Sequence, residues 1–205
     1  MSPSYAKAET HLKNINPTWS KIVDTVGHCS FEPHPERQPY EGLIRAITSQ
    51  KLSAAATDAI IHRLCALYHK HQFPTPKQIV DTDVETLHSC GFSKLKADAI
   101  HNIANAALNN QLPSNDEICK MSNEDLLKAL STHKSVKRWT IEMYMIFTLG
   151  RLNIMPADDA TLRSSITRIF HPDKNLSIEE LETLTSPCAP YQTIAAWYLW
   201  HYPKH

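Results

Sequence analysis

Two short stretches of the sequence carry the residue types that could do chemistry. The first is "MPADDATLR", in which Asp158 and Asp159 follow a proline and precede an apolar helical pattern. We expect Asp158 to cap that helix and Asp159 to lie in its first turn, where the helix dipole favours a negative charge. A carboxylate that instead faces a cleft can stabilise a cationic transition state or orient a water molecule. The residues alone leave both roles open for the second acid.

The second stretch is the basic turn "KSVKRWT", residues 134–140, which separates two amphipathic helical patterns. Such a turn can bind phosphate if its backbone N–H groups and the start of the next helix point outward. Short charge runs are more often ordinary solvated surface, and spacing alone favours a plain helix corner. After the turn, Trp139, Met143 and Phe147 fall on one stripe, which predicts a helix with one apolar face.

The composition indicates a folded globular protein without a net positive charge that would attract nucleic acid. The chain has 205 residues, of which 42% are hydrophobic, enough to fill a core. Its 21 Lys and Arg balance 21 Asp and Glu, so any binding to a polyanion must come from a local patch. The longest apolar runs, such as "IAAWYLW", are too short to cross a bilayer, and the first residues contain no hydrophobic signal core. We therefore expect an intracellular protein with no membrane association.

Cysteine and histidine spacing argues against a metal site. The five cysteines are widely spaced and form no CxxC pair, so they predict reduced and mostly buried thiols. His62, His69 and His71 are close in sequence but have no Cys or carboxylate partners at ligand spacing. We predict no metal.

Helical periodicity recurs along the whole chain and strand signals are few, which predicts an all-α fold. We expect a two-lobed helical bundle: residues 1–30 and 122–205 form one lobe, and residues 31–121 form the other. Near the C-terminus, spacing alone favours simple packing for Trp200, in a helix that already contains Trp197.

Several motifs in order along the chain resemble one known family. They are "PYEGLIRAITSQKLSAAA", "GFSKLKADAIHNIA", "KSVKRWTIEMYMIFTLGRLNIMPADD" and "YQTIAAWYLW". Together they resemble the helix-hairpin-helix DNA glycosylases, in particular the AlkA-like branch with the yeast 3-methyladenine DNA glycosylases. The chain is also similar to the fission-yeast members of this branch, which include a glycosylase-like paralogue. The extra β domain of the bacterial type is absent, so the resemblance implies two helical lobes joined around a helix-hairpin-helix motif.

The resemblance implies an enzyme that flips a damaged purine out of the duplex and hydrolyses its N-glycosidic bond. Asp159 matches the catalytic aspartate of the family, and Asp158 matches a structural neighbour. Trp139 and Trp200 match the aromatic walls of the base pocket, to which we add Met143 on the stripe of Trp139. An electron-rich indole face suits a cationic alkylated base. The bifunctional lyases of the superfamily carry a Schiff-base lysine at the position of Trp139, so the resemblance implies a monofunctional hydrolase.

The segment "SQKLSAAA" matches the loop that enters the minor groove and fills the gap left by a flipped nucleotide. We expect Lys51, Leu52 and Ser53 to form this wedge. The family more often has glutamine at both Gln50 and Lys51, so a cation has replaced the second glutamine here. The alternative for Leu52 is a buried contact at a helix cap.

The hairpin of the family is usually a glycine, a small apolar residue and a second glycine, whose N–H groups bind the phosphates beside the lesion. Here Ser135 and Lys137 occupy the glycine positions. A non-glycine residue at positive φ costs roughly 1 kcal/mol or more, so we expect either a changed hairpin or a strained one. The residues expected to bind DNA phosphate, partly by charge, are Lys134, Ser135, Val136, Lys137, Arg138 and Thr140.

Two functions follow from the resemblance. The first is an active monofunctional alkylpurine glycosylase of the 3-methyladenine type, acting on duplex DNA in base excision repair. The second is a glycosylase-like protein that binds damaged or abasic DNA with little or no excision, because hairpin and wedge are altered. Both imply double-stranded DNA as the partner, a nuclear location, a monomer and no cofactor, although the hairpin of the family sometimes binds a monovalent cation. An all-α interaction domain with no role on nucleic acid is a third, weaker alternative.

Overall fold

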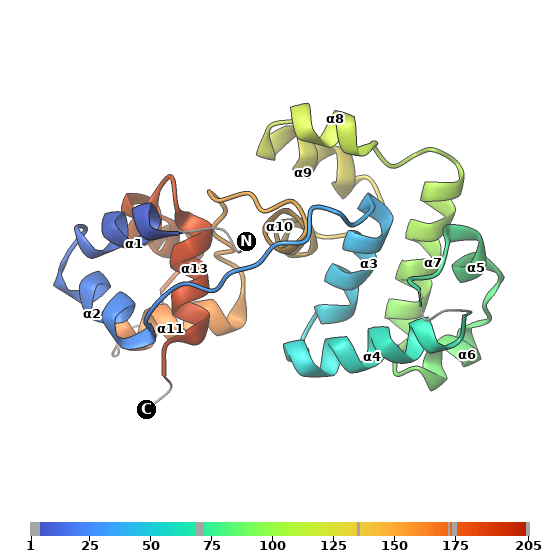
Figure 1. Ribbon diagram of the computed structural model, residues 1–205, viewed down its shortest axis with the longest axis horizontal. Helices are drawn as coiled ribbons and strands as arrows, with labels where there is room; N and C mark the ends of the chain where they lie inside the picture. The colour runs from blue at the N-terminus through green and yellow to red at the C-terminus, as the bar shows by residue number, and fades with distance from the viewer. Residues whose placement is uncertain (1–4, 69–71, 135, 172, 174–175, 204–205) are drawn as a thin grey trace. The chain divides into compact units, whose positions relative to one another are not determined.

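The computed structural model describes residues 5–68, 72–134, 136–171, 173 and 176–203 (Figure 1). All regular secondary structure in these residues is helical, which confirms the all-α class. No helix among them is both long and apolar enough to cross a membrane. The chain divides into two compact units: unit 1 comprises residues 1–34 and 145–205, and unit 2 comprises residues 35–144. Residues 122–144 thus belong to unit 2 and residues 31–34 to unit 1, whereas the sequence predicted the opposite lobe for each of these segments.

Unit 1 is built around one apolar helix. Its elements are α1 (Ala6–Lys13), α2 (Pro17–Val26), α11 (Ala160–Phe170), α12 (Ile178–Thr185), a short 3-10 helix (Ser186–Cys188) and α13 (Gln192–His201). Residues 193–199 of α13 are all buried, and this helix packs against α1, α2 and α11 (Figure 1). Because α13 is apolar on every face, it can only be stable at the centre of a helical cluster.

Unit 2 is organised around α7. Its elements are α3 (Pro39–Ser49), α4 (Ala54–Ala66), α5 (Pro76–Asp81), α6 (Val84–Ser89), α7 (Lys94–Leu108), α8 (Asn115–Lys120), α9 (Asn123–Ser131) and the first part of α10 (Arg138–Phe147). The α7 helix packs against α3, α5 and α6, and its Ile100 and Ile103 are fully buried (Figure 1). From α3, Leu43 and Ile44 are fully buried as well. These side chains recur at helical spacing, which is why the periodicity predicted the helices.

Short polar motifs set the helix boundaries. The N-caps of α4, α7, α9 and α12 are serines, and each accepts a hydrogen bond from a backbone N–H of the first turn. Ser114 caps α8 in a reciprocal capping box with Glu117. After α6, Gly91 adopts a φ of 106° and ends the helix, a conformation that glycine takes without a steric cost. These local signals fix where helices start and stop around the candidate site.

Candidate active site

Asp159 is the N-cap of α11, and one of its carboxylate oxygens carries two hydrogen bonds. Oδ1 accepts from the backbone N–H of Leu162 at 2.8 Å and from Nε1 of Trp200 at 2.9 Å. The residue is half-buried. Two donors on one oxygen fix the direction of the carboxylate, and the N-terminal end of a helix is a favourable place for its negative charge. The arrangement can stabilise a nearby cationic centre or orient a water molecule.

The expected order of the two acids is wrong in one respect. Asp159, and not Asp158, caps the helix, because a turn with a hydrogen bond from Asp159 N to Pro156 O delays the first helical residue to Ala160. Asp158 is exposed, and its Oδ1 lies 3.9 Å from Nη1 of Arg163. One carboxylate therefore serves as both cap and candidate catalytic acid, and its neighbour forms a solvated ion pair.

Phe147 and Trp200 form a stacked aromatic pair beside this acid. Their ring centroids are 5.7 Å apart with an interplanar angle of 25°, and the ring of Phe31 meets Phe147 edge-on at 6.0 Å. Phe147 remains 39% exposed, and Trp200 is half-buried. Since Nε1 of Trp200 bonds Asp159, the stack and the carboxylate form one cluster within unit 1. Phe147 was predicted to lie on the apolar stripe but not in the site; its position two turns after Trp139 was the available signal.

The helix that carries Trp200 is anchored to the N-terminal arm by a polar cluster. The single hydroxyl hydrogen of Tyr198 is shared between two acceptors, Gly27 O at 2.9 Å and Oε1 of Glu9 at 3.2 Å, and the same Glu9 oxygen accepts from Cys29 N at 2.8 Å. Burial raises the pKa of the Tyr198 hydroxyl and raises the pKa of the Cys29 thiol to about 11. Both groups stay protonated at neutral pH, so Tyr198 remains a donor that holds α13 in place.

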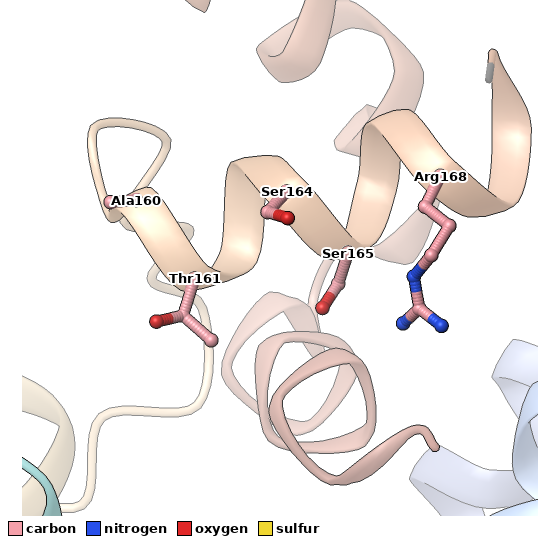
Figure 2. A pocket seen from close by; sticks show the side chains of 5 residues that line it. All are labelled: Ala160, Thr161, Ser164, Ser165 and Arg168. Carbon is pink, nitrogen blue, oxygen red and sulfur yellow. The ribbon is translucent and has the colours of Figure 1, made fainter. Parts of the chain in front are cut away.

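A shallow pocket begins directly after Asp159 and follows α11. Its volume is about 380 Å³, and it is lined by Ala160, Thr161, Ser164, Ser165 and Arg168 (Figure 2). Thr161, Ser165 and Arg168 point to the same side of the helix in this view. Nη1 of Arg168 donates to Pro203 O at 2.6 Å, so its guanidinium group also fastens the C-terminal segment to α11. This hydroxyl-rich surface was not predicted from the sequence.

The expected wedge is an exposed loop between α3 and α4. Lys51 is exposed and has a φ of 59°, a left-handed conformation that is costly for a residue with a Cβ atom. Leu52 is 39% exposed, so the alternative of a buried cap contact is wrong. Ser53 caps α4 by accepting a hydrogen bond from Ala56 N at 3.2 Å. The loop thus presents a lysine and a leucine on a strained turn between two fixed helix ends.

The expected hairpin connects α9 to α10, and Ser135 lies outside the described residues. Val136 is buried, and its N–H donates to His133 O at 3.1 Å. Lys137 and Lys134 are exposed. In the described part of the chain, the non-glycine residues with positive φ are Lys51 and Asn110, so Lys137 does not carry the strain considered for the hairpin.

Two other hairpin residues have side chains engaged within unit 2. Nε of Arg138 donates at 2.8 Å to Oε1 of Glu142, whose side chain is only 4% exposed. Thr140 is fully buried, and its Oγ1 accepts from Nε2 of Gln50 at 2.8 Å. The Thr140 side chain therefore faces the interior of unit 2 and does not reach a phosphate. Arg138 keeps an exposed guanidinium group that a buried carboxylate orients.

The two remaining residues that were expected in the base pocket, Trp139 and Met143, lie in unit 2. Trp139 is half-buried and Met143 is buried, and both belong to the part of α10 that lies in unit 2. Asp159 and Trp200 belong to unit 1. Within the described residues, no cluster of three or more His, Cys, Asp or Glu side chains is suited to holding a metal ion.

Comparison with known proteins gives consistent similarities over most of the chain. Residues 44–190 match the model of the HhH-GPD superfamily of base excision DNA repair proteins. The Schizosaccharomyces pombe alkylbase DNA glycosidase-like protein mag2 is 60% identical over 201 residues, covering 98% of this chain and 94% of that protein. DNA-3-methyladenine glycosylase 1 of the same yeast is 39% identical over 209 residues, covering 98% and 89% of the two chains.

A solved structure is similar over nearly the whole chain. The 3-methyladenine DNA glycosylase Mag1 of fission yeast, in complex with abasic DNA, matches with a TM-score of 0.88 and 38% sequence identity. The match covers 97% of this chain and all of that one.

Proposed function

Because this chain belongs to the HhH-GPD superfamily of base excision DNA repair proteins, we propose that it hydrolyses the N-glycosidic bond of alkylated purines in duplex DNA. The observation that carries the proposal is the Asp159 carboxylate at the start of α11, hydrogen-bonded to Trp200 and beside the exposed ring of Phe147. The similarity to two fission-yeast proteins named for alkylated bases supports the purine class.

The proposed chemistry needs one negative charge next to the sugar. As the C–N bond breaks, positive charge develops on the sugar ring, and the Asp159 carboxylate stabilises it. The carboxylate also orients the water that adds to the sugar carbon. A purine alkylated at N3 or N7 is already cationic, which makes it a good leaving group, and the indole faces of Trp139 and Trp200 each suit the binding of such a cation. With tryptophan at position 139, the chain has no amine there to form a Schiff base, and the reaction ends at the abasic site.

The proposed DNA contacts lie on unit 2. Lys51, Leu52 and Ser53 enter the minor groove at the flipped nucleotide, as wedge side chains do in kinked duplexes. Lys134 and Lys137 bind backbone phosphates near the hairpin by charge, and their contribution falls with added salt. The partner is double-stranded DNA with damaged or abasic sites. The yeast origin of the two relatives supports a nuclear location, because the genome of a yeast lies in the nucleus. We expect the protein to act as a monomer.

The decisive experiment is single-turnover base release from duplexes that contain N7-methylguanine or 1,N6-ethenoadenine. Release by the natural protein, abolished in Asp159→Asn and kept in Asp158→Asn, supports the proposal. The two variants remove the same charge from adjacent residues, so the difference reports the position of the carboxylate. Release that persists in Asp159→Asn would overturn the assignment of the catalytic acid.

A second candidate function is binding to damaged or abasic DNA without excision. Lysine at position 137, where the family usually has glycine, favours it, as does the similarity to a relative that is called glycosidase-like. A titration of an abasic duplex on the same preparation separates the two functions. Tight, salt-sensitive binding together with no release from either lesion selects the binding protein.

A further inference from the structure

Lys96, a residue outside the expected site, bonds the backbone next to the wedge. It lies in the first turn of α7 and is half-buried. Its Nζ donates to Thr48 O at 2.7 Å and to Gln50 O at 2.8 Å, at the C-terminal end of α3. An ammonium group has three N–H donors, and these carbonyls carry the negative end of the helix dipole, so the position suits a lysine.

The other carbonyls at the end of α3 find partners within the same segment. Oγ of Ser49 donates to Ala46 O at 2.9 Å, Gln50 N donates to Ile47 O at 3.3 Å, and Leu52 N donates to Ser49 O at 3.0 Å. The last carbonyls of a helix have no intrahelical donor and need such partners. Lys96 therefore supplies the donor for the carbonyls that remain, Thr48 O and Gln50 O, which lie just before the turn at Lys51.

The turn that follows needs an outside constraint. Lys51 has a φ of 59°, and a lysine left to itself adopts negative φ. The bonds of Lys96 to the preceding backbone fix the entry to this turn, and the Ser53 cap of α4 fixes its exit. The strained conformation persists because both ends are held.

Gln50 extends the connection to the helix that carries the hairpin. Its backbone oxygen accepts from Lys96, and its side-chain Nε2 donates at 2.8 Å to Oγ1 of Thr140 in the first turn of α10. Thr140 is fully buried and directly follows Trp139. Three segments far apart in sequence, on α3, α7 and α10, thus meet at one glutamine within unit 2.

We propose that Lys96 is a positioning residue for the wedge: it holds Gln50 so that the loop of residues 51–53 and the start of α10 keep one relative arrangement. The role of this loop on DNA rests on the proposed function, whereas the bonds of Lys96 belong to the free protein. Burial lowers the pKa of the Lys96 amine, which fits a group enclosed by backbone and not a phosphate ligand in solvent.

The test compares Lys96→Met with Lys94→Met, a control on the same turn of α7 whose side chain is exposed. In the free protein at neutral pH, we expect the Leu52 amide to exchange with solvent about tenfold faster in Lys96→Met and at the natural rate in Lys94→Met, because only the first variant loosens the turn. Equal Leu52 exchange in the natural protein and in folded Lys96→Met would overturn the proposal.

The functional half of the test uses an abasic duplex with 2-aminopurine next to the gap, whose fluorescence reports wedge insertion. Lys96→Met should bind this duplex within about twofold of the natural affinity, and the slope of log K against log salt (the salt slope) should be unchanged. The fluorescence change on binding should nevertheless be smaller. A salt slope reduced by about one unit would instead identify Lys96 as a phosphate ligand and overturn the proposal. No fluorescence change with the natural protein would contradict the wedge itself, while the exchange result would still decide the role of Lys96.

A second variant pair covers the case in which Lys96→Met does not fold. Thr140→Val removes the acceptor of the Gln50 side chain, and Thr140→Ser retains a hydroxyl. We expect Thr140→Val to reduce the 2-aminopurine signal without a change in the salt slope, and Thr140→Ser to restore it. Identical signals from both variants and the natural protein would overturn the connection through Gln50.

Discussion

Units 1 and 2 hold their functional groups by different means. In unit 1, the Asp159 carboxylate is fixed by two direct hydrogen bonds on one oxygen, and a stacked ring pair lies beside it. In unit 2, the wedge is an exposed loop whose shape depends on backbone bonds and includes a lysine at positive φ. Bond cleavage requires one atom at a fixed place, whereas entry into a duplex requires a protruding surface. Substitutions in unit 1 should therefore change the rate of base release, and substitutions in unit 2 should change the complex with DNA.

The largest effect is expected at Asp159, where two replacements separate its two roles. Asp159→Ala removes the helix cap and the charge, so it should lower stability by about 1 kcal/mol and reduce release by about 100-fold or more. Asp159→Asn keeps a cap acceptor and should reduce release to the same degree with nearly natural stability. Urea denaturation and single-turnover release measure the two quantities. If Asp159→Ala kept natural stability and natural release, the Asp159 site of unit 1 would take no part in bond cleavage.

A smaller loss is expected when the exposed ring of unit 1 is removed. Phe147→Ala deletes the ring that stacks on Trp200, and such an aromatic pair is worth about 0.5–1.5 kcal/mol, so release should fall by up to roughly tenfold as Trp200 loses its support. Phe147→Tyr keeps a ring face and serves as the control. Single-turnover release at saturating enzyme is the measurement. Equal rates for the alanine and tyrosine variants would show that the stack on Trp200 does not contribute to base release.

In unit 2, the strain at Lys51 gives a stability prediction that does not depend on catalysis. A β-branched residue tolerates positive φ poorly, so Lys51→Val should destabilise the protein by about 1–2 kcal/mol, and Lys51→Gly should not. Thermal unfolding of both variants measures the difference. If valine and glycine gave the same midpoint, the turn would not hold its left-handed conformation in solution.

The smallest effect is expected for the exposed lysine of the hairpin. Lys137→Gln should lower the slope of log K against log salt for an abasic duplex by about 0.9, the value for one phosphate contact. Lys120→Gln, an exposed lysine on α8, is the control and should leave the slope unchanged. Binding titrations at several salt concentrations give the slopes. Equal slopes for both variants would place the hairpin lysine away from the phosphates.

The sequence predicted the fold class and much of the site, because these depend on local patterns. Helical periodicity identified the helices of both units, and the order of the motifs along the chain indicated the family. The N-cap of α11 was predicted one residue too early, at Asp158. The turn that moves the cap to Asp159 depends on a backbone hydrogen bond from Asp159 N to Pro156 O. The sequence also missed Phe147, whose exposure and stacking come from packing against side chains distant in sequence.

What the sequence determined by itself is the set of chemical groups and the helices that carry them: an acid before α11, aromatic residues on α10 and α13, and lysines at two turns. Tertiary structure decided which groups meet. The bond from Trp200 to Asp159 spans 41 positions, and those of Lys96 and Gln50 span 46 and 90. Contacts at such separations follow from how buried helices pack, and helical periodicity specifies which face is buried but not which partner lies against it.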